Sequence, residues 1–146
     1  MKYIYKILLI FCLFSSLNSI DEITYRLSRG FLGRLIDSFS VKFNRFSGIQ
    51  AEYLEARNPE SKGNKVYNLT TEDLNLPSLK ELFKLFNKIK FPNETNWMDT
   101  KLFDVPIWHL IVDDKDYHSN RGTDFLREFA DLVNLTNIKE YCKNNY

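Results

Sequence analysis

The longest amphipathic pattern in the chain lies in residues 21–57, close to the amino terminus. Apolar side chains recur there at spacings of three and four residues, at Leu32, Ile36, Phe39, Phe43, Phe46 and Tyr53. This spacing places one apolar, strongly aromatic stripe along a helix. A strand pattern competes over residues 39–44, where Phe39, Val41 and Phe43 alternate with polar residues. Because the helical spacing accounts for more apolar positions, the sequence predicts two helices joined near Ser47 and Gly48.

The clearest local signals predict helices in the second half of the chain. Ser78 followed by Glu81 is a capping box, and it precedes an apolar face over residues 79–90 that ends before Pro92. Thr123 is placed to cap another helix, whose inner face carries Phe125, Leu126, Phe129, Ala130 and Val133. A final short helix is expected from Thr136 to Cys142.

Two apolar segments complete the predicted elements. Residues 65–69 (KVYNL) suit a short strand, whereas residues 105–112 (VPIWHLIV) suit either a buried strand or a short buried helix. The predicted fold class is therefore mainly α, a small single-domain bundle of four or five helices. The alternative is an α+β fold in which residues 65–69 and 105–112 form a short strand pair.

The first 19 residues have the pattern of a secretory signal peptide. Lys2 and Lys6 precede an unbroken apolar run over residues 7–14, and small polar residues then lead to Ser19. The apolar run is shorter than the roughly 20 residues that a membrane-spanning helix needs. The sequence therefore predicts cleavage, a single globular domain over residues 20–146, and a secreted, extracellular location.

Cysteine usage bounds how the exported domain is stabilised. After cleavage only Cys142 remains, so the domain contains no internal disulfide and depends on core burial. Cys142 either bridges two chains or is a partly buried thiol on the terminal helix, and the second interpretation is favoured.

Charge excludes one class of partner and suggests another. The domain would carry 18 basic and 19 acidic residues, so it has no global attraction for nucleic acid. Residues 23–50 have a net charge of +4 and residues 104–131 a net charge of −4, so the two regions are expected to face each other. In the alternative, the basic aromatic stretch faces an anionic membrane or an acidic partner. The surface-binding candidates are then Arg29, Arg34, Lys42 and Arg45.

Residues 109–118 gather the side chains best suited to chemistry. His109, Asp113, Asp116 and His118 are of the types that bind divalent metals or act as acid and base. Their spacing matches no established ligand motif, so a solvated turn is favoured, with His109 packed beside Trp108. We therefore predict no metal-binding residue, no catalytic residue and no cofactor. The sequence also has no nucleophile elbow and no phosphate-binding glycine loop, which argues against an enzyme.

Three sequons, at Asn68, Asn93 and Asn134, are candidate glycosylation sites, and Asn93 is expected to be the most accessible. Export, high aromatic content and missing catalytic motifs together predict a secreted, non-enzymatic binding protein that contacts a protein partner through its surface. One alternative is binding to lipid or to a membrane surface through residues 23–50. Another is a small metal-dependent hydrolase built on the Asp/His cluster of residues 109–118. The sequence does not specify an oligomeric state.

Overall fold

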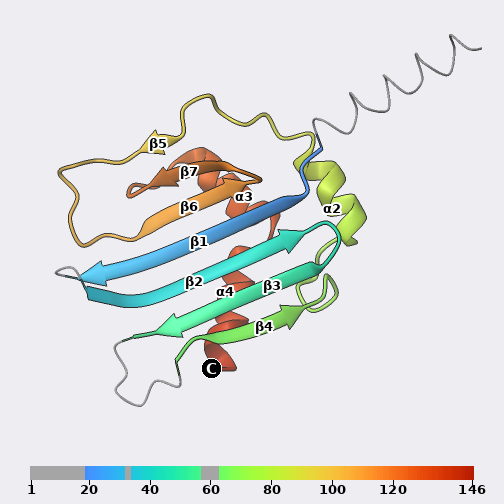
Figure 1. The fold of residues 1–146 in the computed structure, drawn as a ribbon, viewed down its shortest axis with the longest axis horizontal. Helices are drawn as coiled ribbons and strands as arrows, with labels where there is room; N and C mark the ends of the chain where they lie inside the picture. The colour runs from blue at the N-terminus through green and yellow to red at the C-terminus, as the bar shows by residue number, and fades with distance from the viewer. Residues whose placement is uncertain (1–18, 32–33, 57–62) are drawn as a thin grey trace, which may run out of the picture.

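A computed structural model of the protein describes residues 19–31, 34–56 and 63–146, and its centre is one mixed β-sheet (Figure 1). Seven strands follow one another across the sheet in the order β4-β3-β2-β1-β6-β7-β5. All neighbours are antiparallel except β5, which runs parallel to β7. The strands are β1 (Glu22–Phe31), β2 (Arg34–Asn44), β3 (Gly48–Glu55), β4 (Lys65–Leu69), β5 (Asn96–Trp97), β6 (Ile107–Val112) and β7 (Lys115–Ser119). The helices are α2 (Leu79–Phe86), α3 (Asp124–Leu132) and α4 (Leu135–Asn144). Of the predicted signal peptide, only Ser19 falls within the described residues.

The predicted bundle of four or five helices is wrong, because the stretch expected to form two helices forms the antiparallel strands β1, β2 and β3. Residues four apart, such as Phe39 and Phe43, share a side in both a helix and a strand, so they do not separate the two structures. Spacings of three do separate them. Ile36 lies on the opposite face of β2 from Phe39, and Phe46 is 80% exposed in the following turn. Leu32 lies outside the described residues.

The alternative α+β fold is also wrong in its strand pairing. Residues 65–69 form β4, and residues 107–112 form β6, so both segments are strands. They do not pair with each other, however, because β4 pairs with β3 while β6 pairs with β1 and β7. The two strands are therefore parts of a much larger sheet.

The two predicted N-caps are confirmed, whereas the reciprocal half of the Ser78–Glu81 capping box is not. The Ser78 hydroxyl accepts a hydrogen bond from the Glu81 amide at the start of α2, and Thr123 does the same for Leu126 at the start of α3. The Glu81 carboxylate pairs with Lys84 at 2.8 Å instead of accepting from the Ser78 amide, and α2 ends at Phe86 rather than near residue 90. Helix α4 is longer than the predicted 136–142 segment at both ends. Among the described residues, no helix combines the length and the apolar character needed to cross a bilayer.

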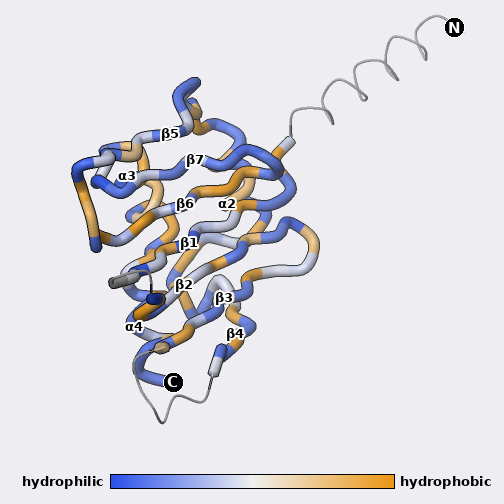
Figure 2. The backbone as a smooth tube through the Cα atoms, turned by 60° about the vertical axis from the view of Figure 1, so that its left-hand side comes forward, coloured by the Kyte–Doolittle hydropathy of each residue, from blue (hydrophilic) through white to orange (hydrophobic). Residues whose placement is uncertain are grey.

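The hydrophobic core lies between the sheet and the helices, which cover one of its faces (Figures 1 and 2). Aromatic rings join the two layers: the Phe86 ring lies 6.0 Å from that of Phe43 on β2 and 5.6 Å from that of Phe129 on α3. Tyr25 on β1 stacks on Phe129 at 6.5 Å. Cys142 on α4 is fully buried, and burial raises the pKa of its thiol to about 11. Complete burial favours the interpretation of Cys142 as a core thiol.

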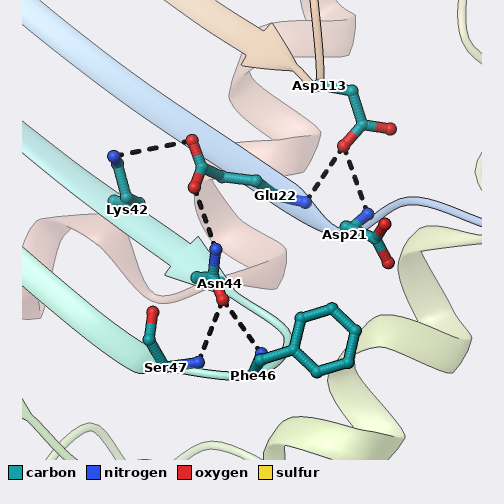
Figure 3. Close-up of polar contacts among 7 residues, drawn as sticks. All are labelled: Asp21, Glu22, Lys42, Asn44, Phe46, Ser47 and Asp113. Carbon is teal, nitrogen blue, oxygen red and sulfur yellow. Dashed lines mark hydrogen bonds and ion pairs between the residues drawn. The ribbon is translucent and has the colours of Figure 1, made fainter.

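The turn between β2 and β3 shows why Ser47 and Gly48 looked like the end of a helix. The Asn44 side-chain oxygen accepts hydrogen bonds from the amides of Phe46 and Ser47, both at 2.9 Å (Figure 3). Gly48 then has φ +100°, a conformation that favours glycine. These residues reverse the chain in a hairpin rather than ending a helix, because asparagine and glycine serve both purposes.

Candidate functional site

A cavity of about 670 Å³ lies between the sheet and helices α3 and α4. Its floor comes from the helix-covered face of three strands and is formed by Tyr25, Leu27, Phe39 and Trp108. The helices add the apolar side chains of Leu126, Ala130 and Leu135. This volume is within the range of small-molecule sites, roughly 300–1,000 Å³. A mainly apolar lining is also typical of such sites.

Polar side chains from α3 and α4, and from the residue before α3, surround the apolar part of the cavity. They are Thr123, Arg127, Asp131, Thr136, Lys139, Glu140 and Lys143. The Arg127 guanidinium already pairs with Asp124 at 2.6 Å. Burial lowers the pKa of the half-buried Lys139 ammonium, and nearby Asp37 offsets part of that effect. Among the described residues, no acid lies within ion-pair distance of Lys139.

Two further cavity-lining residues carry donors without partners. Burial raises the pKa of the Tyr25 hydroxyl to about 12, so this group keeps its proton at neutral pH. Within the described part of the chain, neither the Tyr25 hydroxyl nor the Trp108 indole N–H makes a hydrogen bond, and neither is a buried unpaired atom, so both donors are accessible in the cavity. With Lys139, the cavity is lined by three residues that can donate and that have no acceptor among residues 19–31, 34–56 and 63–146.

The four predicted surface-binding residues lie on β1, on β2 and in the turn that follows. The Arg29 Nε donates to both oxygens of buried Asp37, at 2.8 and 3.0 Å. Lys42 pairs with Glu22 at 3.5 Å, as Figure 3 shows, and Arg45 pairs with Asp21 at 3.6 Å. Arg34 is exposed. These acids are Asp37 on β2, Glu22 on β1 and Asp21 just before it, so the three ion pairs do not join residues 23–50 to the acids of residues 104–131. The two regions nevertheless lie side by side as expected, because β1 pairs with β6.

The three sequon asparagines differ in accessibility. Asn68 on β4 is exposed, and so is Asn93 between α2 and β5. The Asn134 amide nitrogen, where a glycan would attach, donates to the Leu74 carbonyl at 2.9 Å. Glycosylation stays a prediction, and the structure leaves Asn93 and Asn68 as its most accessible positions.

The structure brings together three of the four residues in the predicted Asp/His cluster. His109, Asp116 and His118 meet on the face of the sheet opposite the helices. The fourth, Asp113, is turned away and accepts hydrogen bonds from the Asp21 and Glu22 amides at 3.2 and 3.1 Å (Figure 3).

The favoured interpretation of this cluster as a solvated turn is wrong for three of its members. The turn between β6 and β7 consists of residues 113–114, whereas His109, Asp116 and His118 lie on the strands. His109 and Trp108 are consecutive on β6, so their side chains point to opposite faces. The signal available for this hairpin was weak: a run of β-branched and aromatic residues at 107–112 that ends at the Asp113-Asp114 dipeptide.

Sequence reasoning missed the cavity residues. Tyr25 and Leu27 alternate with polar neighbours, which marks a buried strand face, but nothing local indicates that α3 and α4 leave space above that face. Comparison of the chain with protein-family models, curated proteins and solved structures gives no match. A functional proposal must therefore rest on the chemistry of the cavity itself.

Proposed function

We propose that this protein binds a small amphipathic carboxylic acid, with a long apolar chain or ring system, in the cavity beneath α3 and α4. The observation that carries this proposal is the combination of an apolar floor with three partnerless donor residues, Tyr25, Trp108 and Lys139. The protein acts in this proposal as a non-enzymatic binding protein, and its contact is a cavity open to solvent between the sheet and the helices rather than a flat outer surface.

Ligand binding has an apolar contribution and a polar contribution. Removing apolar ligand surface from water contributes about 25 cal/mol per Å², and the side chains of Leu27, Phe39 and Leu126 supply the surface that receives it. A carboxylate only accepts hydrogen bonds, so it complements a lining that has unused donors. It also supplies the negative charge that the partly desolvated Lys139 ammonium lacks.

Ligand binding is measured through the fluorescence of Trp108, which lines the cavity. The chain has two tryptophans, so a Trp97→Phe background leaves Trp108 as the sole reporter. The protein is titrated with dodecanoate and with dodecanol, which share the apolar chain and differ in charge. We expect dodecanoate to bind more tightly than dodecanol, because only the carboxylate compensates Lys139.

Variants separate the apolar contribution to binding from the polar one. Lys139→Met should abolish the preference for the carboxylate, whereas Lys88→Met, at an exposed position outside the cavity lining, should preserve it. Ala130→Phe should weaken binding of both ligands by filling the cavity. The proposal fails if neither ligand binds, if dodecanol binds as well as dodecanoate, or if Ala130→Phe leaves both affinities unchanged.

A further inference from the structure

The chain contains two histidines, and the fold places them opposite each other. The register of β6 and β7 pairs His109 with His118, and the two rings stack with centroids 5.7 Å apart. Asp116 lies beside both rings. The His109 Nδ1 is 3.2 Å from each oxygen of the Asp116 carboxylate, and the His118 Nδ1 is 4.0 Å from one of them. One ligand atom from each of the three residues lies within 4.8 Å of the other two.

The sheet fixes this arrangement. Asp116 and His118 are two residues apart on β7, so both side chains point to the same face. The short hairpin at residues 113–114 sets the register that brings His109 of β6 to the same place. Because both strands are held in the interior of the sheet, the three side chains are brought together without ordering a loop.

A second observation points to a missing ligand. The His118 Nδ1 atom is buried and has no hydrogen-bond partner among the described residues. Buried polar atoms are nearly always paired, and an unpaired imidazole nitrogen is a free ligand for a metal ion. The cluster is also accessible, since 30% of the His109 side chain, 29% of His118 and 44% of Asp116 are exposed to solvent.

We propose that His109, Asp116 and His118 bind a divalent transition-metal ion of the zinc class. Two imidazole nitrogens and one carboxylate oxygen suit Zn²⁺ and Co²⁺, whereas Mg²⁺ and Ca²⁺ prefer all-oxygen ligand sets. Three protein ligands leave a coordination position for water, as in open zinc sites. The site lies on the opposite face of the sheet from the cavity, so it does not depend on the proposed ligand-binding function.

The test uses the full chain after removal of any affinity tag. Zn²⁺ is titrated calorimetrically with Mg²⁺ in excess, and Co²⁺ is titrated with detection of its visible absorption. We expect one Zn²⁺ ion per chain, no effective competition from Mg²⁺, and a cobalt spectrum that Zn²⁺ abolishes. Absence of Zn²⁺ binding, or displacement of Zn²⁺ by Mg²⁺, overturns the proposal.

Single substitutions then assign the ligands. His109→Asn, Asp116→Asn and His118→Asn should each weaken Zn²⁺ binding by more than about tenfold, since even groups outside the first coordination sphere contribute that much. Asp114→Asn is the matched control, because Asp114 is an exposed carboxylate in the adjacent turn and is not in the cluster. Wild-type affinity in the three ligand variants, or an equal loss in Asp114→Asn, contradicts the assignment.

A measurement on the wild-type protein guards against variants that fail to fold. Because the chain has two histidines, its imidazole C–H signals in an NMR spectrum come from these two rings. Both sets of signals should change together and saturate at one equivalent of Zn²⁺. If only one ring responds, or neither does, the two histidines do not share an ion.

Discussion

The two faces of the sheet are made from the same strands but have opposite characters. On β6, Leu110 faces the helices and is fully buried, while the adjacent His109 faces away and retains 30% of its side-chain exposure. The helix-covered face is aromatic and aliphatic, whereas the open face is mainly polar. Alternation along each strand therefore separates the side chains that stabilise the fold from those free to bind ions.

One charged pair departs from this division. Asp37 is only 7% exposed and lies on the helix-covered side of β2. It is accommodated because Arg29 pairs with it across the strands, which compensates the desolvation of its carboxylate. A buried charge on the covered face thus needs a partner, whereas charges on the open face are solvated.

The largest expected difference is between two phenylalanines. Phe86 is fully buried among aromatic rings, so Phe86→Ala should lower the free energy of unfolding by about 3–5 kcal/mol. Phe103 is 78% exposed, and Phe103→Ala should change the free energy of unfolding by no more than about 0.5 kcal/mol. Urea denaturation measures both. Equal losses would mean that the layer between sheet and helices is not the source of stability.

A neighbouring pair on β6 tests the two faces within one strand. Leu110→Ala should cost about 2–5 kcal/mol because the helices cover this side chain completely. Ile111→Ala should cost less, since Ile111 lies on the open face and is only half-buried. Denaturation curves of the two variants provide the comparison, and a larger loss for Ile111→Ala would show that the open face is covered.

A smaller effect is expected from the cap that starts α3. The Thr123 hydroxyl accepts a hydrogen bond from the Leu126 amide, so Thr123→Ala should cost about 1 kcal/mol. Thr123→Ser retains the hydroxyl and should stay close to the wild type. Thermal unfolding distinguishes the three proteins, and an equal loss in both variants would show that the cap is not responsible.

The smallest expected change in stability concerns Cys142 on α4, whose thiol is buried in the core between the sheet and the helices. Burial raises its pKa from the ordinary 9.0 to about 11, so the folded state holds this proton more tightly than the unfolded state. The corresponding stability is complete below pH 9 and is lost as the pH rises to about 11. The difference in unfolding free energy between the wild type and Cys142→Ala should therefore shrink over that interval. A constant difference in denaturation measured from pH 8 to pH 11 would refute this assignment.

How far the sequence predicts the fold depends on the range of the interactions that decide each element. The starts of α2 and α3 were predicted correctly, because Ser78 and Thr123 act on amides three residues away. Residues 21–57 were assigned incorrectly because several of their apolar spacings, such as that between Phe39 and Phe43, fit a helix and a strand equally well. Their pairing partners include β6, about 80 residues later in the chain, and no local pattern contains that information.

The same limit applies to the two proposed sites. The residue types at positions 109–118 suggested metal chemistry, but only the hairpin register brings His109 to His118 and turns Asp113 away. The cavity gave no sequence signal, because its floor and its walls come from strands and helices separated by about 100 residues.

The sequence by itself determined the helix caps, the turn-forming residues and the supply of buried aromatic side chains, since each depends on local geometry or on composition. The tertiary structure decided which side of each strand is covered, where space remains beneath α3 and α4, and which polar groups meet. Those outcomes depend on contacts between distant segments, and such contacts form only when the hydrophobic effect brings the helices onto the sheet.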